Sequence, residues 1–126
     1  MTEEANDNTA QEANDNTAAK AKTAEGVKFD GDKIRTDLLP IKSIMDWAEV
    51  LTFGADKYKD RNWEKGLDWS RCYGACLRHL FAWWDGETND IESGLNHLAH
   101  AMCNIGFLLE FEKTHPELDN RPSKEE

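Results

Sequence analysis

Histidines and an acidic connector are the residues whose types and spacing could do chemistry. His97 and His100 stand three residues apart and Asn104 follows at i+7, so a helix would place all of them on one face about 60° wide. Such a polar stripe on an apolar helix needs mutual hydrogen bonds or an ion, because each buried polar group without a partner costs about 1 to 3 kcal/mol. His79, in the preceding segment, joins the stripe if the two segments pack antiparallel.

The connector between these segments, residues 85–92 with the sequence DGETNDIE, contains four carboxylates and no basic residue. Like charges repel, so such a loop stays solvated unless a cation neutralises it. Its spacing is not that of a calcium-binding loop. An exposed acidic connector and a cation-binding loop are therefore both open interpretations, as are a hydrogen-bonded polar core and a metal site for the histidines.

If a metal is bound, we expect mixed nitrogen and oxygen ligands, from His79, His97, His100 and Asp90. Such a set favours manganese, cobalt or zinc over magnesium, which prefers oxygen ligands and water. Carboxylates of the connector that are not ligands could accept the proton of an attacking water. Glu87 and Glu92 are the candidates for this catalytic role.

Upstream, residues 53–63 (FGADKYKDRNW) interleave cations with aromatic and amide side chains. Cations can hold phosphates, an aromatic ring can stack on a base, and an amide can read a base edge. The alternative is that the aromatic residues belong to the core and the lysines are surface charges. The expected substrate-binding set is completed by two residues from the later segments and comprises Lys57, Tyr58, Arg61, Asn62, Trp63, Arg78 and Asn104.

The elements that must position these groups are predicted to be helices. Apolar residues at spacings of three and four predict one helix between residues 40 and 54 and a second over residues 69–84, which Gly86 ends. A third helix is expected to start at a Ser93 cap and to run to about residue 112. No segment alternates at period two, so we predict a small all-α domain with three main helices.

The third predicted helix is apolar on more than one face, which three helices cannot cover alone. A symmetric homo-oligomer would cover the surplus. A purely structural helical oligomer with a polar seam is a further alternative.

Composition excludes several classes of protein. The chain has 126 residues and a formal net charge of -10, which argues against a protein that coats a nucleic-acid polymer. No stretch reaches the roughly 20 apolar residues that span a membrane, and the first residues are unlike a signal peptide. Three cysteines cannot pair fully within one chain, which favours a reducing, cytoplasmic compartment.

The two ends of the chain are polar and differ from the middle. Residues 4–10 (EANDNTA) recur unchanged at 12–18, and up to residue 25 no apolar residue after Met1 is larger than alanine. We predict a disordered acidic tail over 1–25, a helical nucleotide-binding domain over 26–112, and a flexible charged tail over 113–126.

Separated strings of this sequence resemble the phage-associated dATP/dGTP diphosphohydrolase family, which is related to the all-α, MazG-like nucleotide pyrophosphohydrolases. They are KFDGDKIRTDLLP, LTFGADKYKDRNWEKGLDWSR and LRHLFAWWDGETNDIESGLNHLAHAMCN, within about residues 27–110. The resemblance implies that a purine deoxynucleoside triphosphate is hydrolysed to the monophosphate and pyrophosphate with a divalent metal, in the control of phage nucleotide pools.

The sequence departs from the wider MazG-like pattern at the metal site. That superfamily holds magnesium with Glu-Glu-x-x-Glu on one helix and Glu-x-x-Asp on the next. Here His97 and His100 occupy the second spacing, and residues 69–84 contain no acid. Either the metal site is rebuilt from imidazoles and connector carboxylates, or the chain is a non-catalytic module that binds or sequesters a nucleotide or a nucleotide-derived signal.

Overall fold

The structure, a computed structural model, describes residues 25–125. The repeat-bearing tail expected over residues 1–25 therefore lies, except for Glu25, outside the described residues. Residues 25–35 belong to a separate unit, in which the N–H of Lys33 donates to the carbonyl of Asp30 (3.1 Å) and closes a turn. The second unit begins at Thr36 and contains all the helices described below.

The second unit is helical, which confirms the predicted all-α class. Its main helices are α1 (Ile41–Tyr58), α2 (Trp69–Trp84) and α3 (His97–Thr114). Short 3-10 turns lie at η2 (Thr36–Leu38), η3 (Asn62–Lys65), η4 (Pro116–Leu118) and η5 (Pro122–Glu125). Residues 25–125 contain no strand, and no helix among them is long and apolar enough to cross a membrane.

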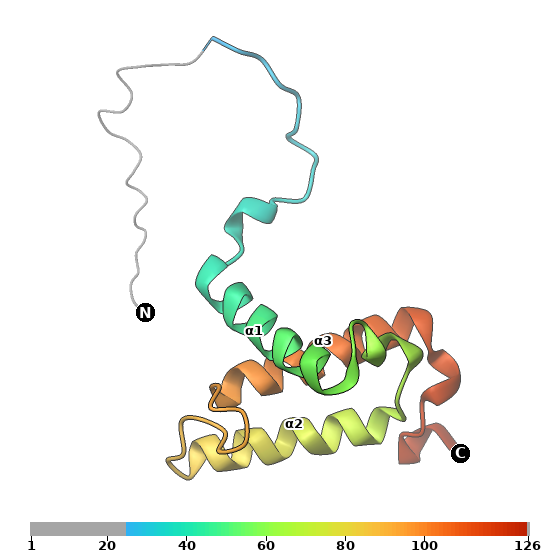
Figure 1. Cartoon of the computed structure of the whole chain (residues 1–126). Coiled ribbons are helices and arrows are strands. Elements are labelled where there is room, and N and C mark those ends of the chain that lie inside the picture. The colour runs from blue at the N-terminus through green and yellow to red at the C-terminus, as the bar shows by residue number, and fades with distance from the viewer. Residues whose placement is uncertain (1–24, 126) are drawn as a thin grey trace. The chain divides into compact units, whose positions relative to one another are not determined.

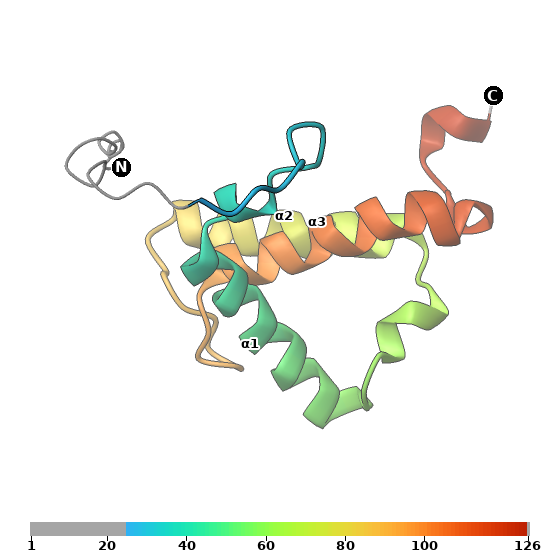
Figure 2. The same cartoon turned by 90° about the horizontal axis from the view of Figure 1, so that it is seen from above.

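The helices pack so that α2 and α3 lie side by side and antiparallel, while α1 crosses α3 (Figure 1; Figure 2). One core cluster joins α1 to α3 through Val50, Ala99 and Cys103. A second joins α2 to α3 through Trp69, Cys72 and Phe111. Cysteines at positions 72, 76 and 103 are buried and unpaired.

Gly106 sets the distance between α1 and α3. A Cβ atom at this position would lie 2.7 Å from Cη2 of Trp47 and closer still to its Cζ2, so the indole occupies the space that any other side chain needs. Because packed interiors leave little room to shift, the crossing of the two helices depends on glycine here. The crossing in turn places the second half of α1 opposite α2 and the connector.

Two predicted helix boundaries differ from those observed. The first helix continues past Gly54 to Tyr58, because nothing crowds that glycine and the apolar pattern persists. The third helix starts at His97, not after Ser93. Its cap is Asn96, whose side-chain oxygen accepts the N–H of Leu98 (2.7 Å).

The C-terminal segment, for which the sequence predicted a flexible tail over residues 113–126, contacts the start of α2. Helix α3 extends to Thr114, and the carbonyl of His115 accepts the indole N–H of Trp69 (3.2 Å). The side chain of Asn120 accepts from the N–H of Ser70 (3.0 Å) and donates to its hydroxyl (2.9 Å). Polar contacts from residues 115 and 120 therefore connect this segment to the start of α2.

Candidate functional site

The connector between α2 and α3 is a folded loop rather than a solvated tether. Gly86 has a φ of 104°, and its N–H donates to the carbonyl of Trp83 while that of Glu87 donates to the carbonyl of Ala82. This pair of hydrogen bonds is a Schellman motif, which confirms that Gly86 ends α2. Asn89 and Asn96 form an isolated antiparallel bridge, so the loop returns beside itself and presents its middle to the helices.

The loop brings Asp90 to the histidines. One carboxylate oxygen of Asp90 accepts a hydrogen bond from the backbone N–H of Ser93 (2.9 Å). The backbone N–H of Asp90 donates to the carbonyl of Leu95 (2.8 Å). The Ser93 hydroxyl forms a hydrogen bond of 2.7 Å with Nε2 of His100. Ser93, which the sequence suggested as a helix cap, therefore connects the acidic loop to the histidine stripe.

The predicted antiparallel packing brings the three imidazoles together. Nδ1 of His79 lies 2.9 Å from Nδ1 of His97, and the rings of His79 and His100 stack with centroids 4.5 Å apart. His97 is only 4% exposed, and its Nε2 lies 2.9 Å from Oε1 of Glu87. The three histidines are thus connected. His97 contacts the carboxylate of Glu87 and the ring of His79, and His79 stacks on His100.

The surroundings of this network set its protonation. Burial lowers the pKa of His79, and the neighbouring His100 lowers it further. Burial also lowers the pKa of His100, although Asp90 opposes the change. For Asp90 burial acts in the opposite direction, but hydrogen bonds from Ser93 outweigh it and leave the pKa below its ordinary value. Neutral imidazoles beside an ionised carboxylate are the protonation states that metal binding requires.

Ligand atoms of His79, Asp90 and His97 all lie within 4.8 Å of one another. These are three of the four residues that the sequence predicted as ligands of a divalent cation; His100, the fourth, is not in the group. His100 stacks on His79 at the edge of the group. The residues present therefore fit an ion of the manganese, cobalt or zinc type.

A cleft of about 1180 Å³ lies next to these histidines, between α1, η3, α2 and α3. Of the predicted site residues, only Glu87 does not line it. The other predicted site residues all line the cleft: His79, Asp90, Glu92, His97, His100, Lys57, Tyr58, Arg61, Asn62, Trp63, Arg78 and Asn104. Residues that were assigned separately to a metal and to a nucleotide thus face one space.

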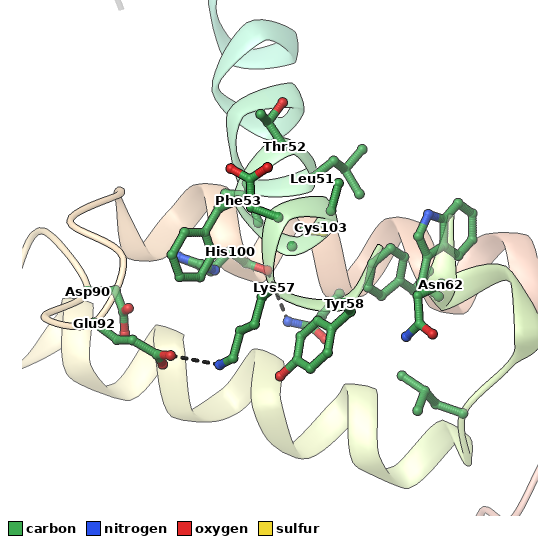
Figure 3. Close-up of a pocket in the computed structure, with 18 of the residues that line it drawn as sticks. Leu51, Thr52, Phe53, Lys57, Tyr58, Asn62, Asp90, Glu92, His100 and Cys103 are labelled. Atoms are coloured by element: carbon green, nitrogen blue, oxygen red, sulfur yellow. Dashed lines mark hydrogen bonds and ion pairs between the residues drawn. The ribbon is translucent and has the colours of Figure 1, made fainter. Parts of the chain in front are cut away.

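Lys57 and Tyr58 extend from the end of α1 into this cleft (Figure 3). The ammonium of Lys57 lies 2.7 Å from Oε2 of Glu92, which raises the pKa of the lysine. Tyr58 is 55% exposed, and the ammonium of Lys57 lies over its ring, 5.2 Å from the centroid. Arg71 and Arg78 line the same cleft from α2, and neither takes part in the ion pairs found among residues 25–125.

Trp63 and Arg61, which both line the cleft, also have partners within the chain. The Trp63 ring stacks on Phe107 with centroids 4.7 Å apart and also contacts Phe111, so it packs against the core. Arg61 pairs with Glu64 at 2.7 Å and its side chain is 79% exposed. Of the two aromatic candidates for base stacking, Tyr58 is the more exposed.

Only one of the two proposed proton acceptors lines the cleft. Glu92 lies in the cleft, whereas Glu87 is outside it and contacts His97. Asn104 lies in the cleft, but its amide nitrogen donates to the carbonyl of His100 (3.0 Å), which leaves its amide oxygen for a ligand. Sequence reasoning missed Ser93 as a site residue, although its position three residues after Asp90 is typical of a side chain that bonds back to the loop.

Comparisons with known proteins point to one family. Residues 23–121 match the family model described as dATP/dGTP diphosphohydrolase, N-terminal. The chain is 33% identical over 96 residues to a protein of Salmonella phage PMBT28 named dATP/dGTP diphosphohydrolase. The aligned part covers 76% of this chain and 33% of the relative, so the chain spans about a third of the length of the curated relative it matches. No solved structure matches the chain.

Proposed function

This chain belongs to the dATP/dGTP diphosphohydrolase family, whose N-terminal part it matches, and from that premise we propose that its cleft hydrolyses a purine deoxynucleoside triphosphate to the monophosphate and pyrophosphate. One observation carries the proposal. The candidate ligands His79, Asp90 and His97 line the same cleft as the cationic residues of α1 and α2. A nucleoside triphosphate in this cleft would reach the metal ligands and the cations at the same time.

The histidine group is proposed to hold the metal on which hydrolysis depends. His79, Asp90 and His97 would be ligands, with His100 beside them. A divalent ion bound there supplies a Lewis acid that polarises a phosphate oxygen and lowers the pKa of a bound water. We expect manganese, cobalt or zinc to support turnover better than magnesium.

The cations of the cleft would hold the triphosphate. Arg78 has no ion-pair partner among the described residues and can meet a phosphate directly. Lys57 is paired with Glu92, so a phosphate that binds the ammonium would compete with that carboxylate. Tyr58 would stack on the purine, and amide groups of Asn62 and Asn104 would read its edge.

Glu92 is the proposed general base. When a phosphate takes over Lys57, the carboxylate loses its ion-pair partner inside the cleft and becomes free to accept a proton. The oxygen of water attacks the α-phosphorus, and the bond from this phosphorus to the oxygen that bridges to the β-phosphorus breaks. Pyrophosphate leaves with that electron pair, and the proton of the water passes to Glu92.

The non-catalytic alternative is favoured by a specific observation. The His79 to His97 contact of 2.9 Å is itself a hydrogen bond, so the network is satisfied without an ion. A module of that kind would retain a nucleotide intact. To separate the two functions, the protein is incubated with each deoxynucleoside triphosphate and a panel of divalent metals, and the products are resolved by chromatography. Monophosphate with pyrophosphate supports hydrolysis, and intact nucleotide retained on the protein supports sequestration.

We also propose that the protein forms a homo-oligomer. On α3, Leu98, Ile105 and Leu109 are 39%, 54% and 58% exposed, which leaves an apolar stripe on the helix surface. A second copy of the chain would cover such a stripe symmetrically. We further propose that the protein acts on phage nucleotide pools in the cytoplasm of the host cell.

A further inference from the structure

Glu87 is the one predicted site residue that lies outside the cleft, yet it touches the candidate metal group. We propose that Glu87 is a positioning residue, whose carboxylate fixes the tautomer of His97 and, through it, that of His79. This inference rests on the proposed function for its purpose, since the two histidines are the candidate nitrogen ligands. Its test does not depend on hydrolysis.

The contacts determine where the protons lie. An ionised carboxylate can only accept hydrogen bonds, so the 2.9 Å contact of Glu87 requires a hydrogen on Nε2 of His97. In a neutral His97 the lone pair is then on Nδ1. That atom lies 2.9 Å from Nδ1 of His79, which must donate the hydrogen of this second bond. The remaining lone pair of His79 is therefore on Nε2.

Burial leaves Glu87 as the partner of Nε2 of His97. The ring is 4% exposed, so this nitrogen has little contact with bulk water while the carboxylate is in place. Without Glu87, a neutral His97 could carry its proton on either nitrogen, and the tautomer with Nδ1–H would turn a proton toward the ligand group. Carboxylates that orient histidine ligands in this way typically change metal affinity about 10–100-fold when they are removed.

The backbone holds Glu87 in place for this task. The N–H of Glu87 donates to the carbonyl of Ala82 (3.0 Å), and the N–H of His97 donates to the carbonyl of Thr88 (2.9 Å). The end of α2 and the start of α3 are thus tied together next to the carboxylate. With its backbone fixed, Glu87 has only side-chain rotamers to lose when its carboxylate orients His97.

The direct test is the tautomeric state of each histidine in the ion-free protein, read by long-range proton to ¹⁵N correlation NMR on ¹⁵N-histidine-labelled samples at mildly alkaline pH. In the wild type we expect a proton on Nε2 of His97 and on Nδ1 of His79. Glu87→Ala should give mixed tautomers at both rings, whereas Glu87→Gln keeps an acceptor oxygen and should retain them. Asp85→Ala removes a carboxylate two residues away and should change neither ring.

Several results would overturn the positioning role. The first is a wild-type His97 that carries protons on both ring nitrogens. The second is a wild-type His97 with no proton on Nε2. The third is a folded Glu87→Ala protein whose histidine tautomers are unchanged. The second readout is the affinity for Mn²⁺ alone, which should fall about 10–100-fold in Glu87→Ala and stay unchanged in Asp85→Ala.

The two proposals fail separately. If the tautomers and Mn²⁺ affinities follow the expectation but no nucleotide is cleaved, only the proposed hydrolysis is refuted. If nucleotide is cleaved and Glu87→Ala leaves both tautomers and affinity intact, only the positioning role is refuted.

Discussion

The ammonium of Lys57, at the end of α1, lies 2.7 Å from a carboxylate oxygen of Glu92, in the connector that follows α2. The pair joins two walls of the cleft, one cationic and one next to the histidine group (Figure 3). Both side chains are partly exposed, so the pair contributes little to stability. A phosphate that binds Lys57 would compete with Glu92 for the ammonium.

If Glu92 is the general base, its loss should affect turnover more than binding. Glu92→Gln is expected to lower kcat for dGTP about 10²–10⁴-fold with a smaller change in KM, because the amide cannot accept the proton. Lys57→Met should instead raise KM. Steady-state kinetics of pyrophosphate release measures both.

Glu64→Gln is the matched control for this pair, because Glu64 pairs with Arg61 and is not among the residues that line the cleft. Its kinetics should match the wild type. A Glu92→Gln protein with the kcat of the wild type would remove the general-base assignment.

The candidate ligand Asp90 should be required for metal affinity. Asp90→Asn removes the negative charge from the group while the amide oxygen can still accept from Ser93, so the loop should keep its fold. We expect Mn²⁺ affinity, measured by isothermal titration calorimetry, to fall at least about tenfold. His115→Gln changes a histidine that contacts Glu64 and Glu117 and none of the other three histidines, so this variant should bind Mn²⁺ as the wild type does. Equal affinity in Asp90→Asn would contradict the assignment.

Gly106 should be intolerant of even a methyl group. Gly106→Ala forces a Cβ atom into the indole of Trp47, and overpacking of this kind costs about 1–3 kcal/mol in the free energy of unfolding. Gly54→Ala is the control, since nothing lies within 4 Å of its Cβ position in α1, and it should be neutral or stabilise by up to about 1 kcal/mol. Urea unfolding compares the two, and an unchanged Gly106→Ala protein would show that the helices separate freely.

The packing of the C-terminal segment should weaken at alkaline pH. Hydrogen bonds to Glu117 (2.8 Å) and to the carbonyl of Glu64 (2.8 Å) raise the pKa of His115. A group whose pKa is higher in the folded state contributes its stability fully below its unfolded pKa of about 6.5 and loses it as pH rises through the folded value. The pKa of Glu117 is lowered by His115, so the pair also weakens in acid as pH falls through that lower value.

Amide hydrogen exchange of residues 115–120, with intrinsic rates corrected for pH, measures this effect. Protection in the wild type should decline from about pH 6 to about pH 9 more than in His115→Gln, which cannot titrate. An identical pH profile in the two proteins would show that the imidazole does not control the segment.

Local sequence patterns predicted the helices because their causes are local. The bounds of α2 follow from its apolar spacing and from Gly86, which supplies the positive φ that ends it. The start of α3 was misplaced because Ser93 and Asn96 are both good caps. The bridge between Asn89 and Asn96, a contact within the loop, decides between them.

Side-chain roles that depend on distant residues could not be predicted. The interleaved cations and aromatics of residues 53–63 do not reveal that Trp63 packs on Phe107, far along the chain, while Tyr58 stays exposed. Equally, Glu87 and Glu92 look alike in the sequence. Glu87 contacts His97 because the connector folds back onto the start of α3, whereas Glu92 contacts Lys57 because α1 crosses α3 beside the connector.

Pyrophosphate release from dGTP by wild type, His79→Ala and His100→Ala, each assayed with Mn²⁺, Co²⁺ and Zn²⁺ and with a chelator, tests the central claim most directly. The wild type should release pyrophosphate only with a metal present. Both variants should lose this activity while their helical circular dichroism stays intact. Unchanged turnover in the folded variants, or wild-type turnover in the presence of the chelator, would contradict a metal-dependent reaction at the histidine group.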